Sequence, residues 1–323
     1  MSKAIFELIQ EDLNILEERL ITATTSDKDI INEIASHVIC AGGKRLRPAL
    51  SLLAARAGKN YSLEKILPLA ASLELIHTAT LAHDDVIDGA GTRRGVPTLN
   101  AKWNNQTAIL GGDFLFARAF SLVAKENYAP YVNYRISELI ANLCEGEILQ
   151  DHAAYVALKD YYTYYDRIKR KTADFLEVAA DLGGFVAGVT EEEQAGLKNF
   201  GHAIGMAFQV TDDILDLSQT EEELGKPAAH DLVCGIVTLP VIYALKESKR
   251  AGELASIVTD EHMTLEMEYR AIEIVTESGG LDFAKSEVKR FIEEAKSSVP
   301  NTISKEIREA FFEVADFIGE RNF

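Results

Sequence analysis

Apolar residues recur at intervals of three and four along nearly all of the 323 residues, and alternating runs of β-branched residues are scarce. This period places apolar side chains on one face of a helix, and we find no segment typical of a β-hairpin. No low-complexity linker divides the chain. The pattern therefore predicts a single all-α domain over residues 1–323, which is long enough to bury a large core. We expect helices over 3–22, 28–41, 46–58, 63–90, 103–127, 130–151, 159–183, 191–218, 231–248, 260–278, 281–297 and 302–319.

Capping residues mark several of these boundaries. Thr190 with Glu193, and Thr220 with Glu223, have the spacing of a capping box. The pair Gly279–Gly280 is typical of a turn that ends one helix and begins another. We interpret "LGGD" (110–113) as a helix start or a close helix contact, and "YYTYYD" (161–166) as core and interface packing.

The charge and the cysteines exclude several classes of protein. A net charge of -18 argues against nucleic-acid binding. Cys40, Cys144 and Cys234 fit neither a disulfide framework nor a zinc site, so we expect buried thiols in a reducing compartment. The N-terminal segment lacks the apolar run of a signal peptide, and no uncharged apolar run is long enough to span a bilayer. We therefore expect a soluble, cytoplasmic protein.

Two clusters of aspartates share the pattern D-D-x-x-D on otherwise apolar helices. They are Asp84, Asp85 and Asp88 in "LAHDDVID", and Asp212, Asp213 and Asp216 in "QVTDDILD". Acids three or four residues apart on a helix repel each other by a few tenths of a kcal/mol. One such cluster is typical of a solvated face, but two of them indicate ligands for a hard cation such as Mg²⁺, which also binds phosphate oxygens. We predict two facing helices whose Mg²⁺ ions bridge a polyphosphate.

Basic residues lie near these clusters and beside glycine turns. They are Lys44, Arg45 and Arg47 after Gly42–Gly43, Arg93 and Arg94 after the first cluster, and later Lys171 and Lys226. Isolated basic residues are usually solvated, but this arrangement suggests more than one phosphate-bearing ligand. His77 lies seven residues before Asp84, on the same helix face. It is either a packed core residue or a hydrogen-bond donor to phosphate.

Five motifs now combine into a family resemblance. "GGKRLRP", "DDVID" followed by "RRG", "RKT", "FQVTDDILD" and "GKPAAHDL" occur in this order. Over roughly residues 35–295 the chain resembles the trans-isoprenyl diphosphate synthases, also called polyprenyl synthetases. The resemblance implies an all-α bundle of the isoprenoid synthase type around a central apolar cavity. It also implies Mg²⁺-dependent, head-to-tail addition of isopentenyl diphosphate to an allylic diphosphate.

The resemblance also implies a role for each matching residue. The implied metal ligands are Asp84, Asp88, Asp212 and Asp216, with three Mg²⁺ ions in the active site. Isopentenyl diphosphate would contact Lys44, Arg47, His77 and Arg94. The allylic diphosphate would contact Arg93, Lys171, Thr172, Gln209 and Lys226. Asp85, Asp213 and Gln150 would support catalysis, and the tail residue Arg321 would fold over the isopentenyl site. The allylic C–O bond would break to a carbocation, the isopentenyl double bond would attack it, and the departing diphosphate would take the released proton.

Small residues precede the first aspartate cluster where short-chain relatives tend to have a bulky aromatic residue. They are Ala79 and Thr80, with Ile76 and Leu73 farther back. One helical turn rises about 5.4 Å, roughly one isoprene unit, so we expect the growing tail to pass this wall. A facing helix with Phe114, Phe116 and Phe120 would close the bottom. We predict a hexaprenyl to octaprenyl product, as in catalytic subunits of bacterial heptaprenyl synthases. Alternatively, the small residues only allow close helix packing.

Several other functions remain open. A short-chain synthase would make farnesyl or geranylgeranyl diphosphate. A terpene cyclase would not need the basic set for a second diphosphate. A non-catalytic subunit would be expected to lose aspartates from one motif, and a generic helical metal-binding protein would show no turnover. We expect a homodimer, or a heterodimer with a smaller subunit.

Overall fold

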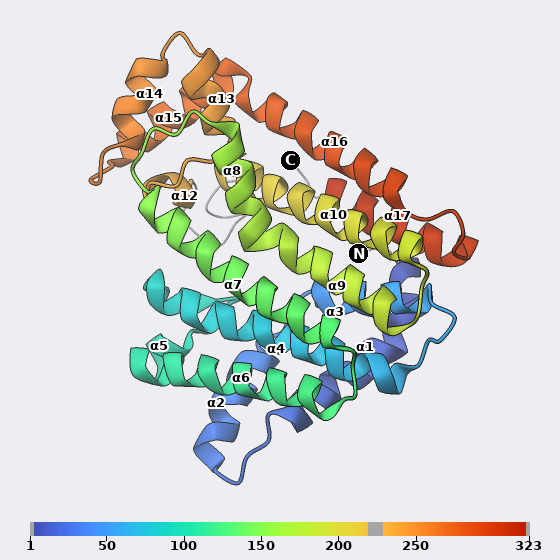
Figure 1. The fold of residues 1–323 in the computed structure, drawn as a ribbon. Helices are drawn as coiled ribbons and strands as arrows, with labels where there is room; N and C mark the ends of the chain where they lie inside the picture. Colours follow the sequence, from blue (N-terminus) through green and yellow to red (C-terminus); the bar gives the residue numbers. More distant parts are fainter. Residues whose placement is uncertain (1–2, 219–228, 321–323) are drawn as a thin grey trace. The chain divides into compact units, whose positions relative to one another are not determined.

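The computed structural model describes residues 3–218 and 229–320, and these residues are almost entirely helical (Figure 1). The all-α prediction is therefore confirmed. The helices are α1 (Lys3–Ala23), α2 (Asp29–Cys40), α3 (Leu46–Arg56), α4 (Leu63–Ile87), α5 (Leu99–Lys102), α6 (Asn105–Lys125), α7 (Pro130–His152), α8 (Tyr161–Ile168), the π-helix η1 (Lys169–Ala173), α9 (Asp174–Val186), α10 (Glu191–Ser218), α12 (His230–Val233), α13 (Leu239–Glu247), α14 (Ala251–Val258), α15 (Leu265–Ser278), α16 (Gly280–Ser298) and α17 (Lys305–Gly319).

The chain divides into two compact units. The first comprises Met1–Arg135, Ala179–Leu197 and Pro300–Ala310, and the second comprises Ile136–Val178, Lys198–Val299 and Phe311–Phe323. Each unit is held together by its own buried contacts.

In the first unit, α4 is the central helix. Its side chains are buried along most of its length, and it packs against α1, α3 and α6. Arg45 joins α1 to α4, because its Nε donates to Glu17 at 2.6 Å and its Nη1 to Glu74 at 2.7 Å. This arginine of "GGKRLRP" is buried and stabilises the fold, so it is not one of the basic groups that face a ligand.

The contact between α4 and α6 depends on the glycine pair of "LGGD". A Cβ on Gly112 would lie 2.2 Å from Nε2 of His83, the residue directly before the first aspartate cluster. The same imidazole nitrogen lies 3.0 Å from the carbonyl oxygen of Ile109. Gly112 therefore allows α6 to approach the end of α4, as we predicted for a close helix contact.

In the second unit, two glycines one turn apart bring α10 against the segment η1–α9. A Cβ on Gly201 would lie 2.4 Å from the carbonyl oxygen of Leu176, and one on Gly205 would lie 2.4 Å from Cα of Ala173. Backbone therefore packs against backbone here. This contact fixes the position of α10 relative to η1. The second aspartate cluster lies on α10.

The structure corrects several predicted boundaries. Thr92–Arg93 pairs with Val96–Pro97 as a two-residue hairpin, β1–β2, which we did not predict. The predicted helix 159–183 is interrupted by η1, and 231–248 is broken into α12 and α13 at Gly235, whose φ is +74°. The predicted helix 103–127 begins later, at α6, and α14 was not predicted at all.

Two other sequence interpretations can be compared directly with the structure. The capping box at Thr190 and Glu193 is confirmed by reciprocal bonds of 2.8 and 3.2 Å, whereas Thr220 and Glu223 lie outside the described residues. The expectation of buried thiols was wrong, because Cys40, Cys144 and Cys234 are all exposed. Each occupies a solvent-facing position on or beside a helix.

Among the described residues, α6 is long and apolar enough to cross a bilayer by length and composition, with a mean hydropathy of 1.4. Asp113 and Arg118 interrupt its sequence, and Gly111, Leu115 and Ala119 are buried against the rest of the first unit. A helix of this kind is also typical of a protein core or a subunit interface.

We expect Gly112→Ala to lower the free energy of unfolding by about 1–3 kcal/mol, because the new methyl group overlaps a held imidazole. Gly252→Ala in α14 is the matched control, since a Cβ there meets no atom within 4 Å. Urea unfolding of both variants tests this prediction. Equal stability of the two variants would show that α6 can move away from α4 at little cost.

Candidate active site

The first aspartate cluster lies at the C-terminal end of α4, and its three acids have different surroundings. Asp84 is partly exposed and Asp88, which caps the helix, is exposed. Asp85 is only 5% exposed, and its Oδ1 accepts a hydrogen bond of 2.7 Å from Nε of Arg93. Burial raises the pKa of Asp85, and the guanidinium of Arg93 opposes this shift. The helix thus turns Asp85 inward and leaves Asp84 and Asp88 accessible.

Basic groups gather beside this cluster within the first unit. The Arg94 guanidinium packs over the backbone of Gly43, where an added Cβ would lie 2.6 Å from Nη1. Burial lowers the pKa of His77 well below its ordinary value, and the charges of Arg47 and Arg94 lower it further. The charges of Arg47 and Arg94 therefore act on His77, and this environment keeps the imidazole neutral. Lys44 is exposed in the loop before α3.

The second aspartate cluster lies near the C-terminal end of α10. Asp212 is partly exposed, whereas Asp213 and Asp216 are only 2% and 3% exposed. Oδ2 of Asp213 accepts a 2.6 Å bond from the Tyr164 hydroxyl, and Oδ1 accepts a 2.9 Å bond from Nε2 of Gln209. Burial raises the pKa of Asp213 to about 6. The carboxylate of Asp216 accepts the backbone N–H of Asp231 at 3.0 Å, so it fixes the start of α12.

The π-helix η1 positions the "RKT" motif. A π-turn contains one more residue than an α-turn and often occurs at a functional site. Here it presents Lys171, whose Nζ lies 2.7 Å from Oε2 of Glu147 on α7. The next residue, Thr172, donates a 2.7 Å bond to Oε1 of Gln209 on α10. Gln150 donates a longer bond of 3.4 Å to Glu147.

Each unit therefore assembles its own share of the predicted site residues. Lys171, Thr172, Gln209 and Gln150 lie close to the second aspartate cluster or to Glu147. Lys226 and Arg321 lie outside the described residues.

The predicted wall residues lie on α4. Ile76 and Ala79 are fully buried, whereas Thr80 is partly exposed and donates to the carbonyl oxygen of His77. Of the aromatic residues on α6, Phe116 lies near His83, with 5.8 Å between the ring centroids, and Phe120 is 44% exposed.

Sequence reasoning missed three residues that hold the predicted ones: Tyr164, Glu147 and Asp231. Packing was the right interpretation for Tyr161, which lies against Phe283, and for Tyr165, which lies against Phe291. It was incomplete for Tyr164, whose hydroxyl reaches the second aspartate cluster. No local spacing in the sequence indicated this contact, because Tyr164 and Asp213 are 49 residues apart.

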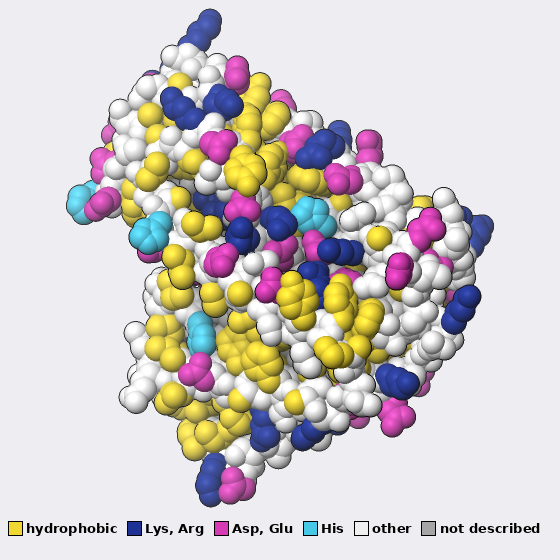
Figure 2. Space-filling model, in the orientation of Figure 1, with side chains coloured by type: hydrophobic (Ala, Val, Ile, Leu, Met, Phe, Trp, Pro, Cys, Tyr) yellow, Lys and Arg dark blue, Asp and Glu magenta, His cyan; other side chains and the backbone are white. Residues whose placement is uncertain are grey.

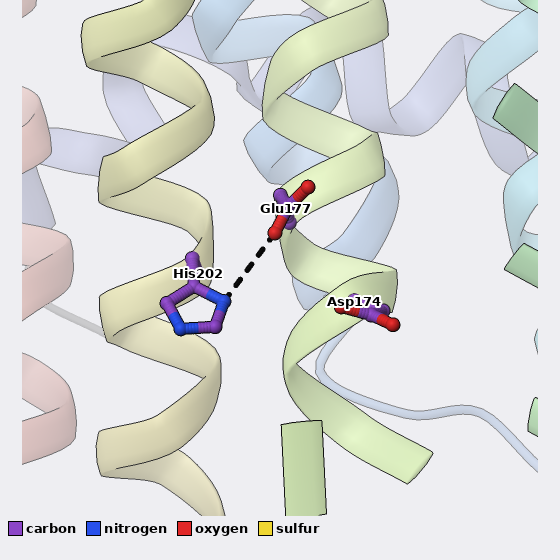
Figure 3. Close-up of side chains that lie close together, drawn as sticks. All are labelled: Asp174, Glu177 and His202. Carbon is purple, nitrogen blue, oxygen red and sulfur yellow. Dashed lines mark ion pairs between the residues drawn. The ribbon is translucent and has the colours of Figure 1, made fainter. Parts of the chain in front are cut away.

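A separate group of potential metal ligands lies on α9 and α10: Asp174, Glu177 and His202 (Figure 3). One ligand atom from each lies within 4.8 Å of the others. However, Lys169 lies 3.6 Å from Asp174, and Lys198 lies 3.5 Å from Glu177. Because these ammonium groups already neutralise both carboxylates, we interpret this group as an ion-pair network.

The side chains of the two aspartate clusters suit a divalent cation better than Asp174, Glu177 and His202 do. The ligand atoms of the clusters are carboxylate oxygens, which hard cations prefer, and at least one acid in each cluster is accessible. Asp84, Asp88 and Asp212 are the acids that retain exposure.

The neutral state of His77 has a measurable consequence. The unfolded chain binds a proton below pH about 6.5 that the folded chain does not bind, so stability falls as the pH drops below that value. Between pH 7.5 and 5.5 this single group should remove about 1.4 kcal/mol from the free energy of unfolding. Urea unfolding of the native chain and of His77→Gln at both pH values isolates this contribution. An equal pH dependence in both proteins would contradict it.

Comparison with known proteins identifies the family. Residues 28–275 match the profile of the polyprenyl synthetase family. The chain is 40% identical over 321 residues to heptaprenyl diphosphate synthase component 2 of Geobacillus stearothermophilus, covering 99% of each chain. It is 34% identical over 292 residues to geranylgeranyl diphosphate synthase of Methanosarcina mazei, covering 89% of this chain and 88% of the relative.

Comparison with solved structures gives the same result. A polyprenyl synthase from Caulobacter crescentus, in complex with calcium and isoprenyl diphosphate, superposes with a TM-score of 0.92 at 34% identity, over 99% of this chain and 98% of that one. The resemblance seen in the sequence motifs is confirmed. The chain belongs to the polyprenyl synthetase family of prenyltransferases, enzymes of isoprenoid biosynthesis that use a divalent metal.

Proposed function

We propose that the chain is a catalytic trans-polyprenyl diphosphate synthase, which adds isopentenyl diphosphate head-to-tail to an allylic diphosphate. One observation supports this most strongly. In each D-D-x-x-D motif the second acid is held inside the protein, by Arg93 or by Tyr164 and Gln209, while the first acid is partly exposed. A non-catalytic chain would have no need for two such motifs with the same arrangement.

The accessible acids suit a site for Mg²⁺. Asp84, Asp88 and Asp212 would hold the ions, and Asp216 would assist from its buried position. The calcium in the Caulobacter crescentus relative is consistent with oxygen ligands of this kind. Bound Mg²⁺ would neutralise the diphosphate and so make it a better leaving group. We propose three ions per active site, as the family resemblance of the two motifs implies.

The basic residues suit two separate diphosphates. Lys44, Arg47, His77 and Arg94 would bind isopentenyl diphosphate, and the neutral His77 would donate one hydrogen bond to it. The allylic diphosphate would be bound by Arg93, Lys171, Thr172, Gln209 and Lys226. A terpene cyclase binds one diphosphate only, so the first basic set favours elongation over cyclisation.

The proposed reaction follows from these contacts. The allylic C–O bond breaks and its electron pair leaves with the diphosphate, whose charge the basic side chains stabilise. The double bond of isopentenyl diphosphate attacks the allylic cation and forms the new C–C bond. The resulting cation loses a proton to the departing diphosphate. Asp85 contacts Arg93 and Asp213 contacts Gln209, so these two acids would keep substrate-binding groups in place. Gln150 contacts Glu147, the partner of Lys171, and would act through that carboxylate.

We propose a hexaprenyl to octaprenyl product, because the positions before Asp84 are the small residues Ala79 and Thr80. The 40% identity to a heptaprenyl synthase component is consistent with this length. A short-chain product remains the second candidate, since the Methanosarcina mazei relative makes geranylgeranyl diphosphate.

We propose that the chain acts as a single cytoplasmic prenyltransferase domain that pairs with a second subunit. Hydrophobic side chains appear at the surface around α5 and α6 (Figure 2). On α6, Ile109, Leu110 and Phe120 are 44%, 58% and 44% exposed. Such a face suits a subunit interface. The second subunit would be another copy of this chain or a smaller protein, and the word "component" in the name of the Geobacillus relative supports the latter.

The central experiment is elongation of farnesyl diphosphate with labelled isopentenyl diphosphate and Mg²⁺. We expect the purified chain, alone or with its partner, to give longer products. Asp84→Ala should lower the turnover by about 10³-fold, since losing a metal ligand removes several kcal/mol of transition-state stabilisation. The exposed Asp27→Ala is the control and should retain full activity. Near-normal turnover of Asp84→Ala would remove the metal role of this motif.

The length of the prenyl product is tested by placing an aromatic side chain at the proposed wall of α4. Thr80 is partly exposed and can accept a larger side chain, so Thr80→Phe should shorten the product by one or more isoprene units. The buried Ala79 allows the same test with Ala79→Phe, at a greater risk of overpacking. Chromatographic sizing of the products measures this. Unchanged product lengths in both variants would show that other residues limit the growth of the prenyl tail.

A further inference from the structure

We propose that Tyr164 is a positioning residue for the allylic diphosphate, acting through Asp213 and Gln209 of the second aspartate motif. This inference rests on the proposed function. Tyr164 is fully buried, so its hydroxyl reaches the substrate only through the residues that it holds.

A directed chain of hydrogen bonds joins Tyr164 to the predicted substrate contacts. The Tyr164 hydroxyl donates to Oδ2 of Asp213 at 2.6 Å, and Nε2 of Gln209 donates to Oδ1 at 2.9 Å. Oε1 of Gln209 in turn accepts from the Thr172 hydroxyl at 2.7 Å. The carboxylate of Asp213 can only accept, so it fixes which end of the Gln209 amide faces it. The other end must then accept from Thr172, beside Lys171 in the π-helix.

The ring of Tyr164 is itself held in place by its neighbours. Arg167 lies with its guanidinium carbon 5.6 Å from the ring centroid, and it donates from Nη2 to the carbonyl oxygen of Val237 at 2.8 Å. Tyr165 packs edge-on at a centroid distance of 5.3 Å. A fixed ring gives the hydroxyl one direction, and that direction points to Asp213.

Two of these hydrogen bonds join separate segments of the protein. Tyr164 is on α8 and Asp213 on α10, while Thr172 lies in η1 and donates back to α10. Gln209 and Asp213 are one turn apart on the same helix. This series of hydrogen bonds therefore sets the side-chain orientation of Asp213, Gln209 and Thr172 together. Without the Tyr164 hydroxyl, one oxygen of a buried carboxylate loses its donor, and the Gln209 amide is free to turn toward it.

The protein has a matched control residue, Tyr165, on the same helix. The hydroxyl of Tyr165 also donates to a carboxylate, Oε2 of Glu287, at 2.7 Å, but Glu287 belongs to α16 and not to an aspartate motif. Tyr164→Phe and Tyr165→Phe each remove one hydroxyl from one tyrosine–carboxylate pair and keep the ring. Only the first variant disturbs the proposed site.

The experiment uses steady-state elongation kinetics with farnesyl diphosphate, isopentenyl diphosphate and Mg²⁺. For Tyr164→Phe we expect the KM of farnesyl diphosphate and the half-saturating Mg²⁺ concentration to rise about tenfold, roughly the effect of one lost hydrogen bond to a charged group. The KM of isopentenyl diphosphate should change less than twofold. Tyr165→Phe should leave all three values within twofold of the native chain. Thermal unfolding of both variants shows any general loss of stability.

A double-mutant cycle adds a test that does not depend on stability. If Tyr164 acts through Asp213, then Tyr164→Phe should have little further effect on the KM of farnesyl diphosphate in an Asp213→Asn background. Additive effects, or equal kinetic changes in Tyr164→Phe and Tyr165→Phe, would overturn the positioning role while leaving the proposed function intact. If the native chain elongates nothing, alone or with its partner, the proposed function itself fails.

Discussion

Burial of carboxylates on apolar helices is the constraint on which this structure depends. An ionised acid away from water is costly unless donors surround it. In the two aspartate motifs the protein supplies such donors to the buried acids: Arg93 donates to Asp85, Tyr164 and Gln209 donate to Asp213, and a backbone N–H donates to Asp216. The raised pKa of Asp213, about 6, shows that the compensation there is incomplete.

Close helix contacts at two glycines lie beside these acids. Gly112 lets α6 reach His83, directly before the first motif, and Gly205 lets α10 reach Ala173, directly after Thr172. In each unit a glycine therefore lies next to a segment that carries predicted site residues, and helix packing at that glycine sets the position of the segment. A methyl group at Gly205 would overlap the Cα of Ala173 and push α10 away from η1, whereas one at Gly112 would overlap the imidazole of His83.

Periodicity and local spacing predicted much of this. The long helices, the capping box at Thr190 and the location of both aspartate motifs on long helices all follow from short-range patterns. The failures involve contacts between distant residues. The hairpin β1–β2 depends on Arg94 at φ +54°, and Arg94 packs over Gly43, about fifty residues earlier. Similarly, the π-turn and the hydroxyl of Tyr164 acquire their roles only when α10 packs against η1. The exposed cysteines show that composition alone does not say which helix face a residue occupies.

The central claim is that both aspartate motifs bind the metal ions that carry the allylic diphosphate. The most direct test is a crystal structure of the chain with Mn²⁺ and an unreactive thio analogue of farnesyl diphosphate, because Mn²⁺ is located by its anomalous signal. The account predicts ions in contact with the carboxylates of Asp84 and Asp212 and with oxygens of the same diphosphate. Ions bound only at Asp174, Glu177 and His202, or a diphosphate that touches neither motif, would contradict it.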